Sequence, residues 1–302
     1  MSYGAKAENL KSEGDILLGS LYICLSATMF AVAGVAVKSA VADIGPVVLV
    51  FWRNVLSFFL IIAVILASSR YSVKEFATKK IKFHMARAVF SMMVLYSYFY
   101  AVSKLSLGTA VLFLSTGPIF IPILALVFFK HLSDREVWIG IFIAFVGVSL
   151  IVRPTSVFIS SGILFGLISG LFGGASTLTI WSMSNTESAV KQLFYFSIFC
   201  VVLSIPLAFW QWKWPAVDTY LPIAVLGVST TLAQYFLSKG FSLAPADKIY
   251  TWNYLSIVIS SLAAYIGWGE KLGALTIAGM VFVVIGARMA TLKFKRRAMQ
   301  GS

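Results

Sequence analysis

The feature that most constrains this chain is a series of apolar segments, each long enough to cross a lipid bilayer. A helix rises 1.5 Å per residue, so about 20 residues span a hydrocarbon core of about 30 Å. The segments lie at approximately 16–37, 47–67, 83–102, 107–129, 136–152, 160–183, 189–210, 220–240, 247–267 and 272–291. This pattern predicts an all-α integral membrane protein with about ten transmembrane helices.

The composition excludes an ordinary soluble domain. Of the 302 residues, 60% are hydrophobic and 12% are charged, whereas soluble domains are about half apolar and about a quarter charged. The net charge of +13 could suggest nucleic-acid binding, but Lys and Arg lie between the apolar segments instead of gathering on one face. We therefore expect the lipid bilayer, and no nucleic acid, as a partner.

The positions of the basic residues predict the orientation. If the N-terminus is cytoplasmic and ten helices cross the membrane, sixteen of the 24 Lys and Arg residues fall on the cytoplasmic side and five on the other. The remaining three, Arg53, Arg87 and Arg288, lie within apolar segments. Because basic residues favour cytoplasmic links, both termini are expected to be cytoplasmic. The first segment is too long for a cleaved signal peptide, so we expect it to be retained.

Short motifs recur between the two halves of the chain. The pattern Ser-Leu-x-x-Ala at 106–110 returns at 242–246, an offset of 136. Gly140 and Gly147 return as Gly279 and Gly286, an offset of 139. These matches predict two repeats of five helices, at 16–152 and 160–291. Since five is odd, the second repeat must be inverted relative to the first, as in many carriers.

The chain resembles the drug/metabolite transporter superfamily, and in particular its EamA-type carriers, over nearly its whole length. The likeness rests on the ordered patches Phe51-Trp52-Arg53-Asn54, Ala86-Arg87-Ala88, Tyr96 to Tyr100, 106–110, Gly117-Pro118-Ile119-Phe120 with Pro122, Trp252-Asn253-Tyr254-Leu255, Gly269-Glu270, Gly279 and Gly286. It implies two inverted five-helix EamA repeats, a central cavity between them, alternating access and a place in the cell inner membrane. His131 departs from the family pattern, which has a Glu there, as Glu270 does in the second half. The run 254–270 is similar to a set that includes S-adenosylmethionine uptake carriers.

Arg53 is the most informative single residue. A charge in the middle of a bilayer costs about 2.5–3.5 kcal/mol or more, so its guanidinium should face protein or water. It lies about six residues into its segment, within reach of the interface for a long side chain. Two roles remain open, a substrate or gate residue and a structural pair or anchor. Arg87 and Arg288 lie nearer the segment ends, where the orientation signal explains them.

Five further residues complete the candidate substrate-binding set with Arg53. They lie near the centres of their segments and are Phe30, Tyr96, Trp181, Trp252 and Asn253. Aromatic faces suit a flat or cationic ligand, although Tyr and Trp also serve simply to pack helices together. We expect these residues to line one central cavity. Lacking a carboxylate, it would suit a neutral, zwitterionic or delocalised organic molecule and would offer a metal ion too few oxygen ligands.

The residue types favour transport over catalysis. No carboxylate pair or histidine cluster occupies a segment interior, and no nucleotide-binding motif is present, so we expect neither an enzyme nor a primary pump, and no cofactor. The sequence predicts a secondary transporter that moves a small organic metabolite by alternating access, an amino acid or a nucleoside-like compound such as S-adenosylmethionine. The alternative is a non-transporting membrane protein such as a membrane-embedded enzyme or an assembly factor. Facilitated diffusion or exchange is as compatible with the sequence as symport, and the oligomeric state stays open.

Overall fold

The computed structural model describes residues 13–68, 73–105, 110, 113–130, 132–152, 161–268 and 273–292. Throughout this part of the chain the regular structure is helical, without strands, as predicted. The α-helices are α2 (Glu13–Ala67), α3 (Ile81–Lys104), α5 (Gly117–Phe129), α6 (Arg135–Val152), α7 (Ser161–Met183), α8 (Ala189–Trp210), α9 (Tyr220–Leu243), α10 (Ala246–Ile249), α11 (Leu255–Trp268) and α12 (Ala274–Leu292). Three short 3₁₀ helices, η1 (Val73–Phe76), η2 (Val217–Thr219) and η3 (Tyr250–Tyr254), complete the described elements.

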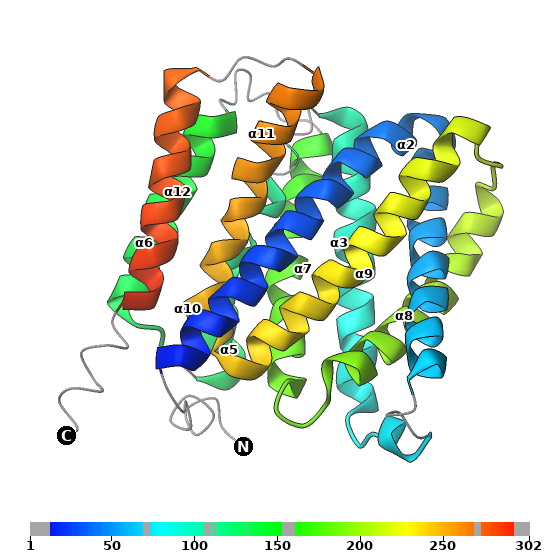
Figure 1. Cartoon of the computed structure of the whole chain (residues 1–302), viewed down its shortest axis with the longest axis horizontal. Helices are drawn as coiled ribbons and strands as arrows, with labels where there is room; N and C mark the ends of the chain where they lie inside the picture. The colour runs from blue at the N-terminus through cyan, green and yellow to red at the C-terminus, as the bar shows by residue number, and fades with distance from the viewer. Residues whose placement is uncertain are drawn as a thin grey trace.

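Helix α2 combines the first two predicted segments. Its 55 residues are interrupted at Gly45, whose φ of 73° is a left-handed conformation that glycine adopts without steric cost. Pro46 follows, and proline fits the first turn of a new helix because that position needs no N–H donor. The helix therefore consists of two arms, 13–44 and 46–67, which meet at the bend visible in Figure 1.

The number of membrane crossings stays a prediction. Within the described residues, five helices are long and apolar enough to cross a membrane, and one of them is the bent α2, which is longer than two crossings require. The segments predicted at 107–129 and 247–267 are not regular throughout. Helix α5 begins only at Gly117, after a turn at Ser115 and Thr116, and the later segment is divided by η3.

The packing of the helices follows the predicted repeat. The most extensive contacts join α2 to α9, α12 to α6, and α3 to α7. In the predicted repeat, the first helix of the first half, which is part of α2, corresponds to α7. Likewise α3 corresponds to α9, and α6 corresponds to α12. The contact between α2 and α9 is therefore equivalent to the contact between α7 and α3, and the contact between α6 and α12 is equivalent to itself. The two halves therefore exchange equivalent contacts, as two related units facing each other would.

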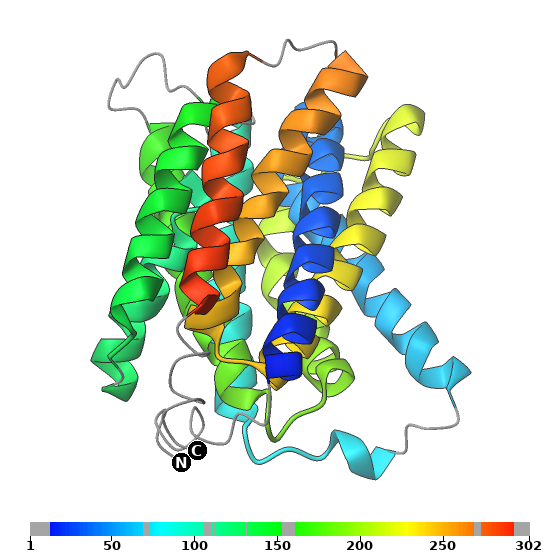
Figure 2. The same cartoon turned by 60° about the vertical axis from the view of Figure 1, so that its left-hand side comes forward.

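The first helices of the two halves run in opposite directions. A Cβ on Gly19, near the start of α2, would lie 3.4 Å from Ala244, just after α9. The hydroxyl of Ser184, just after the end of α7, donates to the carbonyl of Phe241 at 2.8 Å. The start of α2 and the end of α7 thus meet the same end of α9, as an inverted repeat requires. Figures 1 and 2 show the start of α2 and the end of α12 at one end of the molecule.

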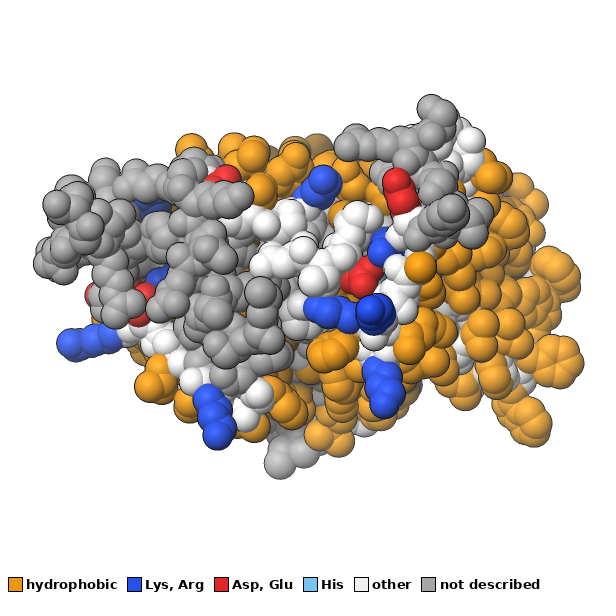
Figure 3. All heavy atoms as spheres, turned by 90° about the horizontal axis from the view of Figure 1, so that it is seen from below, with side chains coloured by type: hydrophobic (Ala, Val, Ile, Leu, Met, Phe, Trp, Pro, Cys, Tyr) orange, Lys and Arg blue, Asp and Glu red, His pale blue; other side chains and the backbone are white. Residues whose placement is uncertain are grey.

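The surface of the bundle suits lipid along its sides. Large hydrophobic side chains, among them Leu66, Phe209 and Ile266, are more than three-quarters exposed. Figure 3 looks at the end where α2 begins and shows Lys and Arg side chains over that face, with hydrophobic side chains around its edge. This distribution fits the predicted cytoplasmic location of that end. The orientation in the inner membrane stays a prediction.

Candidate functional site

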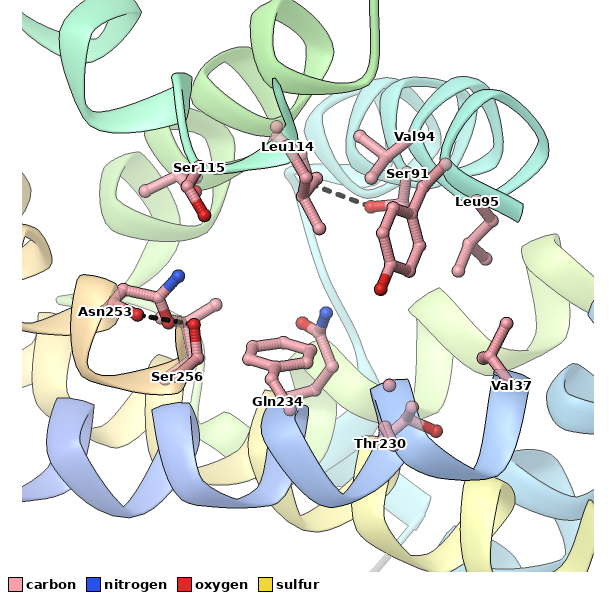
Figure 4. A pocket seen from close by; sticks show the side chains of 18 of the residues that line it. Val37, Ser91, Val94, Leu95, Leu114, Ser115, Thr230, Gln234, Asn253 and Ser256 are labelled. Carbon is pink, nitrogen blue, oxygen red and sulfur yellow. Dashed lines mark hydrogen bonds between the residues drawn. The ribbon is translucent and has the colours of Figure 1, made fainter. Parts of the chain in front are cut away.

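A cavity of about 140 Å³ lies between the two halves of the bundle. An engineered cavity of about 150 Å³ in another protein holds a benzene molecule, so this one admits a group of about that size in the present conformation. Figure 4 shows part of its wall, with the amide groups of Gln234 and Asn253 pointing into the open space. Residues of both halves line it, which is where the resemblance places the central cavity of such carriers.

The lining follows helical periodicity on each element. Helix α3 contributes Ser91, Val94, Leu95, Tyr98 and Phe99, at the spacing of one helix face. The same spacing places a face of each neighbouring helix on the cavity, and the contributing residues are Phe30, Ala33, Gly34, Val37, Gly173, Ser176, Thr177, Ile180, Leu226, Thr230, Gln234 and Leu237. The wall is therefore mainly apolar, with small hydroxyl groups at intervals.

The two irregular segments also reach the cavity. Leu114 and Ser115 lie at the turn before α5, and Tyr250 and Asn253 lie in η3. With the offset of 136, position 115 corresponds to position 251, so the two interruptions fall at equivalent places in the repeat. Non-helical backbone at membrane depth is tolerated where it lines a cavity, because groups there can be hydrogen-bonded by protein, water or ligand.

Arg53 faces the protein interior, as predicted. It is only 2% exposed and lines the cavity from the second arm of α2. Its Nε donates to the hydroxyl of Thr230 at 3.1 Å and its Nη1 to the Asn54 side-chain oxygen at 2.8 Å. The Asn54 amide nitrogen in turn donates to the Cys200 carbonyl at 3.3 Å. Neutral groups thus hold the guanidinium in place.

A second buried arginine lies behind the cavity wall. Arg87, on α3, is fully buried and donates from Nη1 to Gln192 at 3.1 Å and from Nη2 to Gln234 at 2.9 Å. The guanidinium carbons of Arg53 and Arg87 lie 5.5 and 4.7 Å from the centre of the Phe196 ring, distances typical of cation–π contacts. The interpretation of Arg87 as an orientation signal therefore leaves out its buried contacts with Gln192, Gln234 and Phe196.

The structure brings together three of the six predicted site residues. Phe30, Arg53 and Asn253 line the cavity, whereas Tyr96, Trp181 and Trp252 do not. Trp181 is 3% exposed and packs in a second apolar cluster, against which Trp252 also packs, and Tyr96 packs on the main core. The expectation that all six residues line one cavity therefore differs from the structure. Tyr96, Trp181 and Trp252 lie on faces of their helices next to the face that lines the cavity. Substrate contact by any of the six stays a prediction.

Small polar residues supply much of the lining that the sequence analysis did not select. Ser91, Thr177, Thr230, Ser256 and Ser260 lie on it. A search for serine and threonine at a spacing of three or four in the apolar segments could have found some of them, as at Ser256 and Ser260. Gln234, Tyr98 and Ser115 also lie near segment centres, and all three reach the cavity.

Polar contacts join separate parts of the chain near both ends of the bundle. The carboxylate of Asp43 accepts from Lys213 Nζ at 3.0 Å, from the Ala216 N–H at 2.8 Å and from the Thr219 hydroxyl at 2.8 Å. Elsewhere, the Lys248 ammonium pairs with Asp134, and the Ser133 hydroxyl donates to Asp247 at 2.9 Å. Both sets connect the first half to the second, so a rearrangement of one half against the other must break or move them.

Two halves of apolar helices around a cavity with polar groups are the architecture of a secondary membrane transporter. The family model of the EamA-like transporter family matches the chain twice, over residues 17–153 and 160–292. The chain therefore belongs to the EamA-like transporter family, within the drug/metabolite transporter superfamily.

Curated relatives are transporters by name. The chain is 26% identical to the pseudopaline exporter CntI of Pseudomonas aeruginosa, over 88% of this chain and 93% of that protein. It is also 26% identical to the S-adenosylmethionine uptake transporter of Rickettsia felis, over 72% and 73%. A solved structure titled "Crystal structure of protein" shares the fold, with a TM-score of 0.75 at 16% identity, and the match covers 95% of this chain and 99% of that one.

Proposed function

We propose that this protein is a secondary transporter that moves a small organic metabolite, an amino acid or a nucleoside-like compound, across the cell inner membrane by alternating access. The observation that carries the proposal is the cavity between the two halves, which combines aromatic walls with amide, hydroxyl and guanidinium groups. Stacking surfaces and hydrogen-bonding groups together suit an organic molecule that has both a flat and a polar part.

The relatives support the class of cargo and leave the direction open. One is named an exporter of pseudopaline and another an uptake transporter of S-adenosylmethionine, so both directions of transport occur among them. S-adenosylmethionine contains an amino-acid part and a nucleoside part, and it is therefore the first compound to test. Because it is larger than a benzene-sized group, we expect the cavity to widen when it binds.

The alternative, a membrane-embedded enzyme or an assembly factor, has less support. The described lining residues include no carboxylate, histidine or cysteine that could act as acid, base or nucleophile. The named relatives cited above are transporters.

Uptake into vesicles tests the proposal. Purified full-length protein reconstituted into liposomes is expected to accumulate labelled S-adenosylmethionine or labelled L-tryptophan in a saturable way, and internal unlabelled compound should accelerate entry by exchange. Protein-free liposomes are the control. Uptake of both compounds at the rate of the protein-free liposomes, with correctly inserted protein, would contradict the proposed class of cargo.

A further inference from the structure

The central cavity carries a positive charge that the surrounding protein does not neutralise. Of the described residues that line it, Arg53 alone is charged. Arg87 lies directly behind the wall, joined to the cavity-lining Gln234 by a hydrogen bond of 2.9 Å. Neither guanidinium forms an ion pair with any carboxylate of the described residues. Within the described part of the chain, their side-chain partners are neutral amides, a hydroxyl and the Phe196 ring.

Hydrogen bonds to neutral groups hold these cations without balancing their charge. A guanidinium has five N–H donors, and the described partners of each arginine occupy two of its nitrogens. Buried charges in proteins are normally paired, since an isolated charge in a medium of low dielectric constant is costly. Two cations that share one aromatic ring also repel each other. A negative charge in the cavity, close to both guanidinium groups, would relieve both costs.

The cavity offers a position for that negative charge. Arg53 reaches it from α2, and the amide of Gln234 reaches it from α9. The Gln234 oxygen already accepts from Arg87, so its amide nitrogen is the end left to donate to a ligand, and Figure 4 shows this amide pointing into the cavity. A guanidinium beside an amide N–H forms a donor pair that matches the two oxygens of a carboxylate.

We propose, on the basis of the transport function proposed above, that the transported molecule carries a carboxylate and that this carboxylate binds between Arg53 and Gln234. The remainder of the molecule then extends along the cavity towards Phe30, Asn253 and Ser256. The cargo is thus a carboxylic acid or a zwitterion, and a purely cationic amine is excluded because it would meet the same uncompensated positive charge. Binding of the acid also lowers the net positive charge of the site. The cost of burying the two arginines is therefore smaller when the cavity holds the acid than when it does not.

Matched pairs of compounds test this proposal. L-Tryptophan and tryptamine differ in the carboxylate, as do S-adenosylmethionine and its decarboxylated form. Competition with labelled uptake in proteoliposomes measures the relative affinity within each pair. We expect the acid to bind about 10-fold more tightly or better, the range for a charge-assisted hydrogen-bonded contact. Equal affinity within both pairs would overturn the carboxylate proposal and leave the transport function standing. Transport of neither member of either pair would instead contradict the proposed function.

An isosteric charge substitution makes the test specific to this site. Gln234→Glu places a carboxylate within hydrogen-bonding distance of Arg87 and beside the cavity, so it should supply the missing charge internally. We expect this variant to fold with at least the thermal stability of the unmodified protein and to lose the preference for the acid. Gln211→Glu makes the same chemical change at an exposed position after α8 and should keep the preference. A Gln234→Glu protein that still prefers the acid as strongly would overturn the proposal.

A second variant covers the case in which Gln234→Glu does not fold. Arg53→Gln removes the cavity-lining charge and keeps hydrogen-bonding groups for Thr230 and Asn54. The ratio of the affinity for L-tryptophan to the affinity for tryptamine is then expected to fall towards one. The affinity for tryptamine should change less than the affinity for L-tryptophan. An unchanged ratio in this variant would show that Arg53 acts only in packing and would refute the proposal.

Discussion

Replacing Gly286 by valine is expected to remove most of the folded protein from the membrane. A Cβ at this position would lie 2.5 Å from the Ala144 nitrogen and 2.5 Å from the Gly140 oxygen. These are backbone atoms of α6, so no side-chain rotation can relieve the clash. Helices α6 and α12 would have to separate along their contact, and we expect a cost above the ~1–3 kcal/mol of ordinary overpacking.

Size-exclusion chromatography of a fluorescent fusion, solubilised in mild detergent, measures this effect. The Gly286→Val protein should give a small monodisperse peak and a low melting temperature. Gly140→Val should behave alike, since its Cβ would lie 2.6 Å from the Gly286 oxygen. A Gly286→Val variant with the yield and melting temperature of the unmodified protein would show that α6 and α12 do not pack as described.

Replacing Gly173 by leucine is expected to have the opposite combination of effects, namely normal folding and lost transport. Gly173 lies on α7 and lines the cavity, and a Cβ there would meet nothing within 4 Å. A leucine side chain adds four carbon atoms to a cavity of about 140 Å³, which leaves too little room for a ring-sized group. Leucine also favours helix more than glycine does, by roughly 0.5–1 kcal/mol.

Uptake of labelled S-adenosylmethionine or L-tryptophan is expected to fall at least about 10-fold in Gly173→Leu at equal protein level. Gly173→Ala, which adds a single methyl group, is the matched control and should keep most of the uptake. If Gly173→Leu folds well and transports at the original rate, the cavity lies outside the transport path. Comparing the two substitutions thus distinguishes two roles of glycine. Gly286 gives the space that helix packing needs, and Gly173 gives the space that the cargo needs.

The sequence predicts the class of fold well because the bilayer imposes strong rules on it. The length of the apolar segments predicts helices, and the glycines repeated at an offset of 139 predict the repeat. Their role in the close backbone approach of α6 and α12 is seen only in the structure. The bend of α2 at Gly45 falls between the predicted segments 16–37 and 47–67, so the sequence indicates a break there. The interruptions near 115 and 250–254 are harder to predict, because they fall inside the segments predicted at 107–129 and 247–267, and both of them reach the cavity.

The site is predicted only in part because composition does not give the rotation of a helix about its axis. Trp181 and Ile180 are neighbours in sequence, yet only Ile180 lines the cavity. Large aromatic residues attract attention, but Trp181 and Trp252 pack between helices, whereas smaller residues such as Ser176 and Ser256 form the wall. Arg53 is found from sequence because a charge inside an apolar segment is costly. The position of Arg87 beside it depends on the tertiary packing.

Accessibility of the cavity from the two sides of the membrane tests the central claim most directly. Ser115 lies on the cavity at the turn before α5, and Ser115→Cys changes the size of the side chain little. The background would carry alanine at the two native cysteines, Cys24 and Cys200, and must retain uptake. Ser204→Cys, at a fully buried position on α8 outside the cavity lining, is the control that should stay unlabelled.

A membrane-impermeant thiol reagent is applied to one side of oriented vesicles and then, in separate samples, to the other. Alternating access predicts that the thiol of the Ser115→Cys variant is labelled from each side and that S-adenosylmethionine or L-tryptophan, whichever is transported, slows the reaction from both. Labelling from one side only, unaffected by either compound, would contradict the claim that this cavity carries a metabolite across the membrane.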